Sequence, residues 1–380
     1  MRILMSTWGW RSHFYGLVPL GWALRTAGHE VLVASHPSMT RTISESGLPA
    51  VPIGKDVDFT SAFSGRIGKV GQDGLEPAIT ADGGVVLLAD AMLDELVAFG
   101  RAYRPDLLVW EPFNLAAAVA AAALGVPGVL ALWGPDSSVT LRLDPEAVIG
   151  PLARRFGLGA DDVSLTGTLT LDPVPAPMQV PLRGPSQPIR FVPYNGTAVV
   201  PTWLRHPAER RRICVTSGTM MAGAGLTDRL ELPRTIRAVA ELDAEIIVVV
   251  AEPPELGPLP DNVRVTDAPL ALHLLLPTCA ALVQQGGAGT TMTALAAGVP
   301  QLILPRVSDQ HFNAERLART GAGTWLENPD SATLRDAAGE LAGDDGPWRT
   351  AATLMRHRIQ EMPPPAEVIN LLPYREGAGA

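Results

Sequence analysis

Residues 281–305, ALVQQGGAGTTMTALAAGVPQLILP, contain a short apolar run, a glycine turn, a helix-like segment and a second apolar run. This order is typical of a strand, turn, helix and strand unit, which builds a parallel sheet. The first amides of a helix after such a turn lack partners, glycine removes the obstructing Cβ, and the helix dipole is positive there. The stretch therefore predicts an anion site, although a tight turn without a ligand would also use glycine.

The known phosphate-binding motifs differ from this turn. A dinucleotide fingerprint needs a further glycine at position 292, where the chain has Met292, and the sequence contains no P-loop Gly-Lys-Thr. We therefore expect an anion site of another kind.

The same alternation of apolar strands and helix-like segments extends in both directions from this stretch. The strand-like run RRICVTSG at 211–218 precedes it, and the N-terminal half repeats the pattern with RILMST, EVLVAS and DLLVWE. Near-continuous apolar strands suit a parallel sheet that is covered on both faces. We predict an α/β chain with two Rossmann-like, doubly wound domains.

Prolines suggest where the two domains separate. Residues 172–205 are too rich in proline for a helix or a central strand, so we place a linker there. The expected division is an N-terminal domain over 1–171, this linker, a C-terminal domain over 206–362 and a final segment over 363–380.

Two further segments, 55–84 and 134–165, do not fit the regular alternation. Insertions of this length in α/β domains are often lids or binding loops, and ordinary surface loops are the alternative.

Composition narrows the partners and the compartment. The 380 residues carry a formal net charge of −9 and their Lys and Arg residues are scattered, which argues against nucleic acid and an anionic membrane as partners. Cys214 and Cys279 lie in apolar runs, so we expect two buried, reduced thiols. The opening MRILMSTWGW lacks the long apolar core of a signal peptide, and no later stretch has the length of a membrane span. We expect a cytoplasmic protein.

The motif GGAGT and the following TALAAGVPQLILPRVSDQHFNAERLARTGAG resemble the donor-binding region of family 1 glycosyltransferases of the GT-B architecture. The opening MRILMSTWGWRSHFYGLVPLGWALRTAGHEVLVAS is similar to that of bacterial enzymes that glycosylate polyketide and macrolide antibiotics, and the closing MPPPAEVINLL is similar as well. The resemblance implies two domains facing across a cleft, with the acceptor in the N-terminal domain, the nucleotide sugar in the C-terminal domain, and a final segment that returns to the N-terminal domain. It implies transfer of a deoxysugar, with inversion, from a thymidine diphosphate donor to a small polyketide-type acceptor.

The resemblance places the catalytic histidine at His13, in the loop after the first strand. An imidazole with a pKa near neutrality suits a base that removes the proton of an acceptor hydroxyl. Glu111, at the end of DLLVWEP, matches the carboxylate that orients this histidine, and Asp136 is the competing candidate. Aromatic residues near loop ends are candidates for acceptor contacts, as is Asp136, although aromatic residues also build cores; they are Trp8, Trp10, Phe14, Tyr15 and Trp133.

The donor residues that the resemblance implies lie after three strands of the second domain. The leaving diphosphate would meet Thr216, Ser217, Gly218 and Thr219, and also Gln285, Gly286, Gly287, Ala288, Gly289 and Thr290. The nucleobase would meet Asp267, Ala268 and Leu270, and the sugar would meet Asp309 and Gln310. The family commonly has histidine where this chain has Gln284 and Gln285, and glutamine donates a hydrogen bond without becoming cationic. Asp309 has an alternative role as the cap of a helix that begins near His311.

No cofactor or metal is expected beside the nucleotide sugar. The triplet Asp56-Val57-Asp58 has the form of a metal-binding DxD, but it lies far in sequence from the glycine turns, and a helix terminus supplies the charge stabilisation that a metal would give. Two other functions remain as alternatives, a nucleotide-sugar epimerase of the same architecture and a noncatalytic sugar-nucleotide-binding paralogue. A homodimer and an auxiliary activator protein are the further partners that the resemblance raises.

Overall fold

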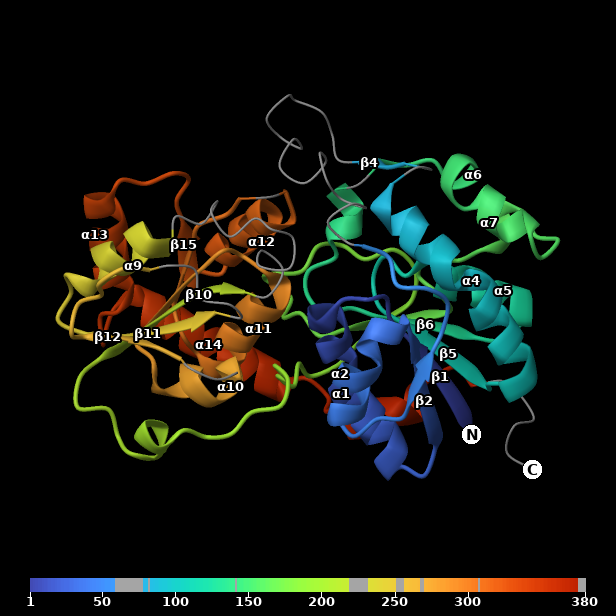
Figure 1. The fold of residues 1–380 in the computed structure, drawn as a ribbon, viewed down its shortest axis with the longest axis horizontal. Coiled ribbons are helices and arrows are strands. Elements are labelled where there is room, and N and C mark those ends of the chain that lie inside the picture. The colour runs from blue at the N-terminus through green and yellow to red at the C-terminus, as the bar shows by residue number, and fades with distance from the viewer. Residues whose placement is uncertain are drawn as a thin grey trace. The chain divides into compact units, whose positions relative to one another are not determined.

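A computed structural model describes residues 1–58, 78–80, 83–140, 142–218, 232–250, 256–266, 270–306 and 308–374. The chain forms two compact units (Figure 1). The first consists of Met1–Pro173, Val180–Arg190 and the chain from Met362 onward, and the second of Val174–Gln179 and Phe191–Glu361. Two Rossmann-like domains were expected, and each unit is built on one large parallel sheet with helices, which confirms the α/β fold class.

The first unit is built on a seven-stranded sheet, as far as the described residues show, with the order β3-β2-β1-β5-β6-β8-β9 and parallel pairs throughout. A parallel pair, β4 with β7, lies outside this sheet. The strands are β1 (Arg2–Ser6), β2 (Glu30–Ser35), β3 (Ala50–Pro52), β4 (Ala78–Ile79), β5 (Leu107–Trp110), β6 (Gly128–Ala131), β7 (Arg142–Leu143), β8 (Leu169–Asp172) and β9 (Ser186–Pro188). The α-helices are α1 (Arg11–Thr26), α2 (Thr40–Glu45), α4 (Gly84–Tyr103), α5 (Leu115–Leu124), α6 (Pro145–Val148), α7 (Gly150–Arg154) and α15 (Pro365–Val368).

The core of this unit follows from its sequence pattern. The alanine-rich α5 is apolar all round, and packs with α4 in one cluster that includes Leu4 and Leu108 of the sheet. A helix that is apolar on every side must be buried. Asn114 caps its start by accepting from the Ala117 amide, and Gly125 ends it with a φ of 60°, in the left-handed region that favours glycine.

The second unit carries a six-stranded parallel sheet, within the described residues, with the order β12-β11-β10-β13-β14-β15. Its strands are β10 (Arg212–Gly218), β11 (Glu245–Val250), β12 (Val263–Val265), β13 (Ala281–Gln284), β14 (Gln301–Ile303) and β15 (Gly323–Trp325). Its α-helices are α9 (Leu232–Ala240), α10 (Leu272–Leu275), α11 (Ala288–Ala297), α12 (Ser308–Ala318), α13 (Ser331–Leu341) and α14 (Pro347–Glu361).

Strand β10 shows why this sheet is buried on both faces. Ile213 and Val215 belong to one apolar cluster, with α9 and α13, whereas Cys214 belongs to another, with α10 and α11. Successive side chains of a strand point to opposite faces, so both faces are covered. Cys214 and Cys279 are buried free thiols, as the sequence predicted, and burial raises the pKa of both.

The proline-rich stretch expected as a linker is packed within the two units. Val174 and Met178 are buried against α11 and α12 of the second unit, whereas residues 180–190 supply β9 to the first sheet. The final segment packs in the first unit, where the Arg190 amide donates to the Pro363 carbonyl at 2.7 Å.

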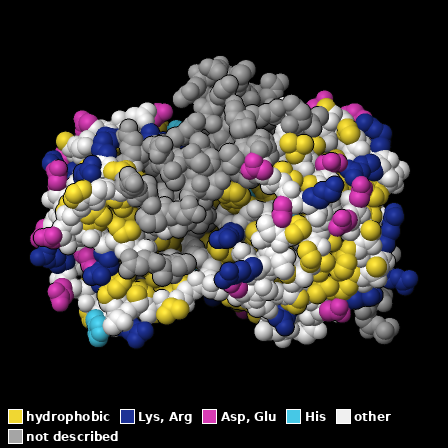
Figure 2. All heavy atoms as spheres, viewed as in Figure 1, with side chains coloured by type: hydrophobic (Ala, Val, Ile, Leu, Met, Phe, Trp, Pro, Cys, Tyr) yellow, Lys and Arg dark blue, Asp and Glu magenta, His cyan; other side chains and the backbone are white. Residues whose placement is uncertain are grey.

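Figure 2 shows Lys and Arg side chains interspersed with Asp and Glu over the described part of the face in view. None of the helices in the described ranges has the length and apolarity to cross a membrane.

Candidate active site

Each sheet has one topological switch point, at which the strand order reverses. The strands that follow the first strand are added on one side of it, and the later strands are added on its other side. In the first sheet this switch lies between β1 and β5, and in the second between β10 and β13. Crevices for ligands in open parallel sheets form at such switch points, beyond the carboxyl ends of the strands. The two switch points therefore predict one site in each unit, formed by the residues that follow these strands.

His13 and Glu111 meet at the first switch point. His13 lies in the first turn of α1, which follows β1, and Glu111 comes directly after β5. Nδ1 of His13 is 3.0 Å from Oε2 of Glu111. The Glu111 side chain is fully buried, whereas 18% of the His13 side chain is exposed. This arrangement orients the ring through one nitrogen and leaves the other for a reacting group.

The Glu111 carboxylate also accepts hydrogen bonds from three donors. The Thr7 hydroxyl and the Trp8 amide donate to Oε1, and the Trp133 indole donates to Oε2, each at 3.4 Å. A carboxylate accepts all of these bonds, which hold it in place behind His13. The sequence pointed to Glu111 and His13 but not to Thr7, because a lone threonine after a strand gives no distinctive signal.

Two indole rings flank His13. The Trp8 and Trp133 ring centroids lie 4.9 and 4.8 Å from that of His13. Trp133 comes this close because Gly16 of α1 has no side chain, and a Cβ there would lie 2.8 Å from the Cβ of Trp133. Of the aromatic acceptor candidates, these two lie against His13.

The remaining aromatic candidates are placed differently. Trp10 lies at the N-terminus of α1 and is partly exposed. Tyr15 is partly buried, and burial raises the pKa of its hydroxyl. Phe14 is completely buried in the core, so it presents no surface to an acceptor and the expectation of a contact is corrected. An aromatic residue in a sequence does not show which face of its helix is buried.

The loop after Glu111 adopts a conformation that is unusual for its residues. Phe113 has a φ of 71°, in the left-handed region that bulky residues rarely occupy. The next residue, Asn114, caps α5 and donates to the Ser6 hydroxyl at 3.1 Å, which ties the loop to β1. Backbone strain of this kind persists where the surroundings fix it, and it is frequent at functional sites.

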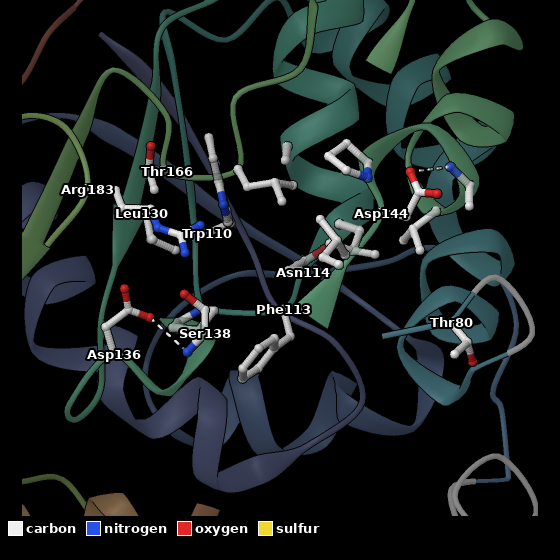
Figure 3. Close-up of a pocket in the computed structure, with 18 residues that line it drawn as sticks. Thr80, Trp110, Phe113, Asn114, Leu130, Asp136, Ser138, Asp144, Thr166 and Arg183 are labelled. Carbon is white, nitrogen blue, oxygen red and sulfur yellow. Dashed lines mark hydrogen bonds between the residues drawn. The ribbon is translucent and has the colours of Figure 1, made fainter. Parts of the chain in front are cut away.

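A cavity of about 810 Å³ opens beside this loop within the first unit. Trp110 and Phe113, on either side of Glu111, line it together with Asn114, and residues 134–165 supply Asp136 and Ser138 (Figure 3). Asp136 accepts from the Ser138 amide at 3.0 Å, whereas Glu111, the other candidate carboxylate, contacts His13. The segment 134–165 forms α6 and α7 and a wall of this cavity; most of the other irregular segment, 55–84, lies outside the described residues.

The glycine turn occupies the second switch point. Gly286 has a φ of 101°, and a Cβ there would lie 2.9 Å from the Gln310 carbonyl, so only glycine fits. Gly287 is the N-cap of α11, whose first turn contains Ala288, Gly289 and Thr290. The first amides of a helix have no intrahelical partner and point outward with the positive end of the dipole. The turn can therefore receive an anion.

The two glutamines before this turn have separate surroundings. Gln284 donates to Thr291 Oγ1 at 2.9 Å and to Gln301 Oε1 at 2.8 Å, and accepts from the Gly286 amide, so it fixes the turn. Gln285 is buried, and its Oε1 has no hydrogen-bond partner within the described structure. Its Nε2 lies 2.2 Å from the position a Cβ would take on Gly218, which brings Gln285 beside the end of β10. A buried acceptor without a partner is costly, so a ligand donor would stabilise it.

The other predicted donor residues that the structure describes lie at or after the ends of strands in this sheet. Thr216 and Ser217 are buried at the end of β10, and Leu270 is largely buried. The helix expected near His311 begins at Ser308, so Asp309 lies within the first turn of α12, not at its cap. Thr219, Asp267 and Ala268 lie outside the described residues.

Helix α12 is hydrogen-bonded to the glycine turn. Gln310 is buried and its Oε1 accepts from the Arg306 amide at 2.8 Å, while Asn313 donates to the Gly286 carbonyl at 2.8 Å. Asn313 was not predicted, because a polar residue on an amphipathic helix gives no sign that it faces inward.

The Asp56-Val57-Asp58 triplet was discounted as a metal site. Asp56 accepts from the Ser38 amide at 2.9 Å. Within the described ranges, no group of three or more His, Cys, Asp or Glu side chains is arranged to hold a metal ion.

Comparison with known proteins agrees with this architecture. The family model described as erythromycin biosynthesis protein CIII-like matches with its N-terminal domain over residues 22–218 and with its C-terminal domain over 233–373. TDP-daunosamine transferase DnrS of Streptomyces peucetius is 36% identical, with 98% of this chain and 96% of that protein covered. The 10-deoxymethynolide desosaminyltransferase of Streptomyces venezuelae is 35% identical over 97% of this chain and 96% of its own.

Solved structures lead to the same class. Spinosyn forosaminyltransferase SpnP has a TM-score of 0.83 and 33% identity, with 98% of both chains covered. Glycosyltransferase VinC in complex with DTDP has a TM-score of 0.80 and 33% identity, again with 98% of both chains covered. The two parallel-sheet units and these likenesses define a glycosyltransferase of GT-B architecture. The chain belongs to the erythromycin biosynthesis protein CIII-like family.

Proposed function

We propose that this glycosyltransferase moves a deoxysugar from a thymidine diphosphate donor onto a hydroxyl of a polyketide-type aglycone, with inversion at the anomeric carbon. The names of its relatives support the substrate classes, since they include a TDP-daunosamine transferase, and VinC was solved with DTDP. The observation that carries the mechanism is the 3.0 Å contact between His13 Nδ1 and the buried Glu111 carboxylate.

In this proposal His13 is the general base. Bond formation at the anomeric carbon makes the acceptor hydroxyl more acidic, and Nε2 takes its proton while Glu111 holds the ring and stabilises the charge that forms on it. The largely apolar cavity beside Glu111 is the proposed acceptor pocket, and Asp136 in its lining is a proposed contact. Trp8, Trp10, Tyr15 and Trp133 do not line this cavity and are proposed as acceptor contacts on the His13 side of the site.

The second unit is proposed to hold the donor. The outward-facing amides of Gly287, Ala288, Gly289 and Thr290 would bind the leaving diphosphate, together with the hydroxyls at the end of β10. Gln285 would contact the phosphates without neutralising them. Asp309, with Gln310, is proposed to bind hydroxyls of the sugar.

A product assay tests this function directly. The purified chain is incubated with TDP-deoxysugars and polyketide aglycones, and a glycoside with the anomeric configuration opposite to that of the donor is expected by mass spectrometry and NMR. A processed sugar formed without any acceptor would indicate the epimerase, and donor binding without turnover would indicate the noncatalytic paralogue. The names of the relatives favour neither alternative, since they describe transferases.

We also propose that neither a metal nor a cofactor takes part, because helix-terminal amides and hydroxyls are placed to stabilise the diphosphate. Activity that EDTA abolishes and magnesium restores would contradict this. The homodimer and the auxiliary activator stay predictions, which sedimentation and the activity of the chain alone can test.

A further inference from the structure

Two groups compete for one nitrogen of His13. The indole Nε1 of Trp8 lies 2.5 Å from His13 Nδ1, and the Oε2 of Glu111 lies 3.0 Å from the same atom. The Trp8 side chain is almost completely buried, and its ring meets the imidazole edge to face at an angle of 64°.

The two contacts require opposite states of Nδ1. An indole N–H only donates, so Nδ1 must accept and the single proton of a neutral imidazole must lie on Nε2. The Glu111 carboxylate only accepts, so it requires the proton on Nδ1. The Thr7, Trp8 and Trp133 donors all use Glu111 as an acceptor, which is the role of an ionised carboxylate.

The two tautomers differ in what they can do. With the proton on Nδ1, Nε2 has a free electron pair that can remove the proton of an acceptor hydroxyl. With the proton on Nε2, that electron pair is absent and the ring cannot act as a base through that nitrogen. The balance between Trp8 and Glu111 therefore sets how much of the enzyme is ready to react.

We propose that Trp8 is a positioning residue that sets the tautomer of His13. Its indole N–H favours the Nε2–H form, and it must leave Nδ1 before His13 can take a proton. The proposal rests on the proposed role of His13 as base. The backbone of the turn is fixed, because the Thr7 amide donates to the Ala34 carbonyl at 3.1 Å and the Trp10 amide to the Trp8 carbonyl at 2.7 Å. The release is therefore a rotation of the Trp8 side chain.

The tautomer can be measured without substrates. In protein labelled with ¹⁵N-histidine, the nitrogen shifts of the neutral ring distinguish the two forms, and His13 is assigned among the seven histidines with the His13→Gln variant. Trp8→Phe keeps an aromatic ring and removes the N–H. We expect its ratio of Nδ1–H to Nε2–H to rise about fivefold to tenfold, because the Nε2–H form loses the free energy of one hydrogen bond. Its kcat should rise by up to the same factor.

Two further variants sharpen the result. Glu111→Gln removes the opposing charge and is expected to move the ratio toward Nε2–H. Trp22→Phe is the matched control, because Trp22 lies near the other end of α1 from His13 and its indole donates to the Ser46 carbonyl. The tautomer ratio and kcat of this variant should equal those of wild type. If Trp8→Phe does not fold, Trp8→Leu removes the same donor.

An unchanged tautomer ratio in a folded variant that lacks the Trp8 N–H would overturn the proposal, as would a shift toward Nε2–H. Because this readout needs no turnover, it is independent of whether His13 is the base, which kinetics of His13→Ala decide separately.

Discussion

The two switch points occupy the same position in their sheets but carry opposite chemistry. The first, between β1 and β5, is lined by an imidazole, a buried carboxylate and two indoles, and it suits proton transfer. The second, between β10 and β13, presents glycine backbone, hydroxyls and amides, and it suits a bound anion. The difference shows that the fold decides where a ligand can bind, whereas the side chains decide what happens there.

The largest effect is expected at the first switch point. His13→Ala should lower kcat by about a hundredfold or more, the range for loss of a general base. Steady-state kinetics on purified enzyme measure it, with circular dichroism to show that the variant folds. Near-normal turnover would show that His13 is not the general base, and the first switch point would then not be the place of proton transfer.

The next effect is expected at the second switch point. Asp309→Asn should lower kcat/KM with the intact donor by about tenfold to hundredfold, because a charged acceptor of sugar hydroxyls is lost, while binding of thymidine diphosphate alone changes little. Kinetics set beside calorimetry separate the two quantities. Asp309 lies in the first turn of α12, where an acidic residue also stabilises the helix. Equal losses in both assays, or none in either, would favour that structural role.

A smaller effect, on stability, should distinguish the glycine of the proposed phosphate-binding turn, Gly286, from a glycine in an exposed turn. Gly286→Ala is expected to lower the free energy of unfolding by about 1 to 3 kcal/mol, since alanine is strained at a φ of 101° and its Cβ would press on the Gln310 carbonyl. Gly28→Ala is the matched control, with a φ of 88° and no atom within 4 Å of the added Cβ. Urea titrations compare the two. The same loss in both would show that contact with α12 contributes nothing.

The smallest effect is expected at Gln285, a position where the family commonly has histidine. Gln285→His introduces an imidazole with an ordinary pKa of about 6.5, which is positive below that pH and neutral above it. We expect the variant to bind thymidine diphosphate about threefold more tightly at pH 6 than at pH 8 once the pH dependence of wild type is subtracted. No difference between variant and wild type in calorimetry would indicate that position 285 lies away from the phosphates.

The sequence predicted the second site more completely than the first. The glycine turn and its helix are contiguous, so one stretch contains the strand, the turn and the helix start. His13 and Glu111 come close only because β1 pairs with β5, and such a long-range pairing has no local signal. Family resemblance supplied both residues, but it did not show that Trp8 and Trp133 donate toward the same pair, nor that Phe14 faces the core.

Polar residues that act through packing were the hardest to predict. The sequence identified Gln284 only as a position where the family commonly has histidine, and in the structure it fixes the glycine turn. Asn313, for which the sequence made no prediction, donates to the Gly286 carbonyl. Both roles depend on which groups the fold buries, and neither residue type nor spacing specifies that.

The division of labour between the two switch points can be tested most directly by the dissociation constant of thymidine diphosphate for the His13→Ala variant. If the second unit alone holds the diphosphate, calorimetry should give a value within about twofold of wild type, even though turnover is lost. A dissociation constant raised about tenfold or more in the folded variant would show that the first switch point helps to bind the phosphates, which would contradict this account.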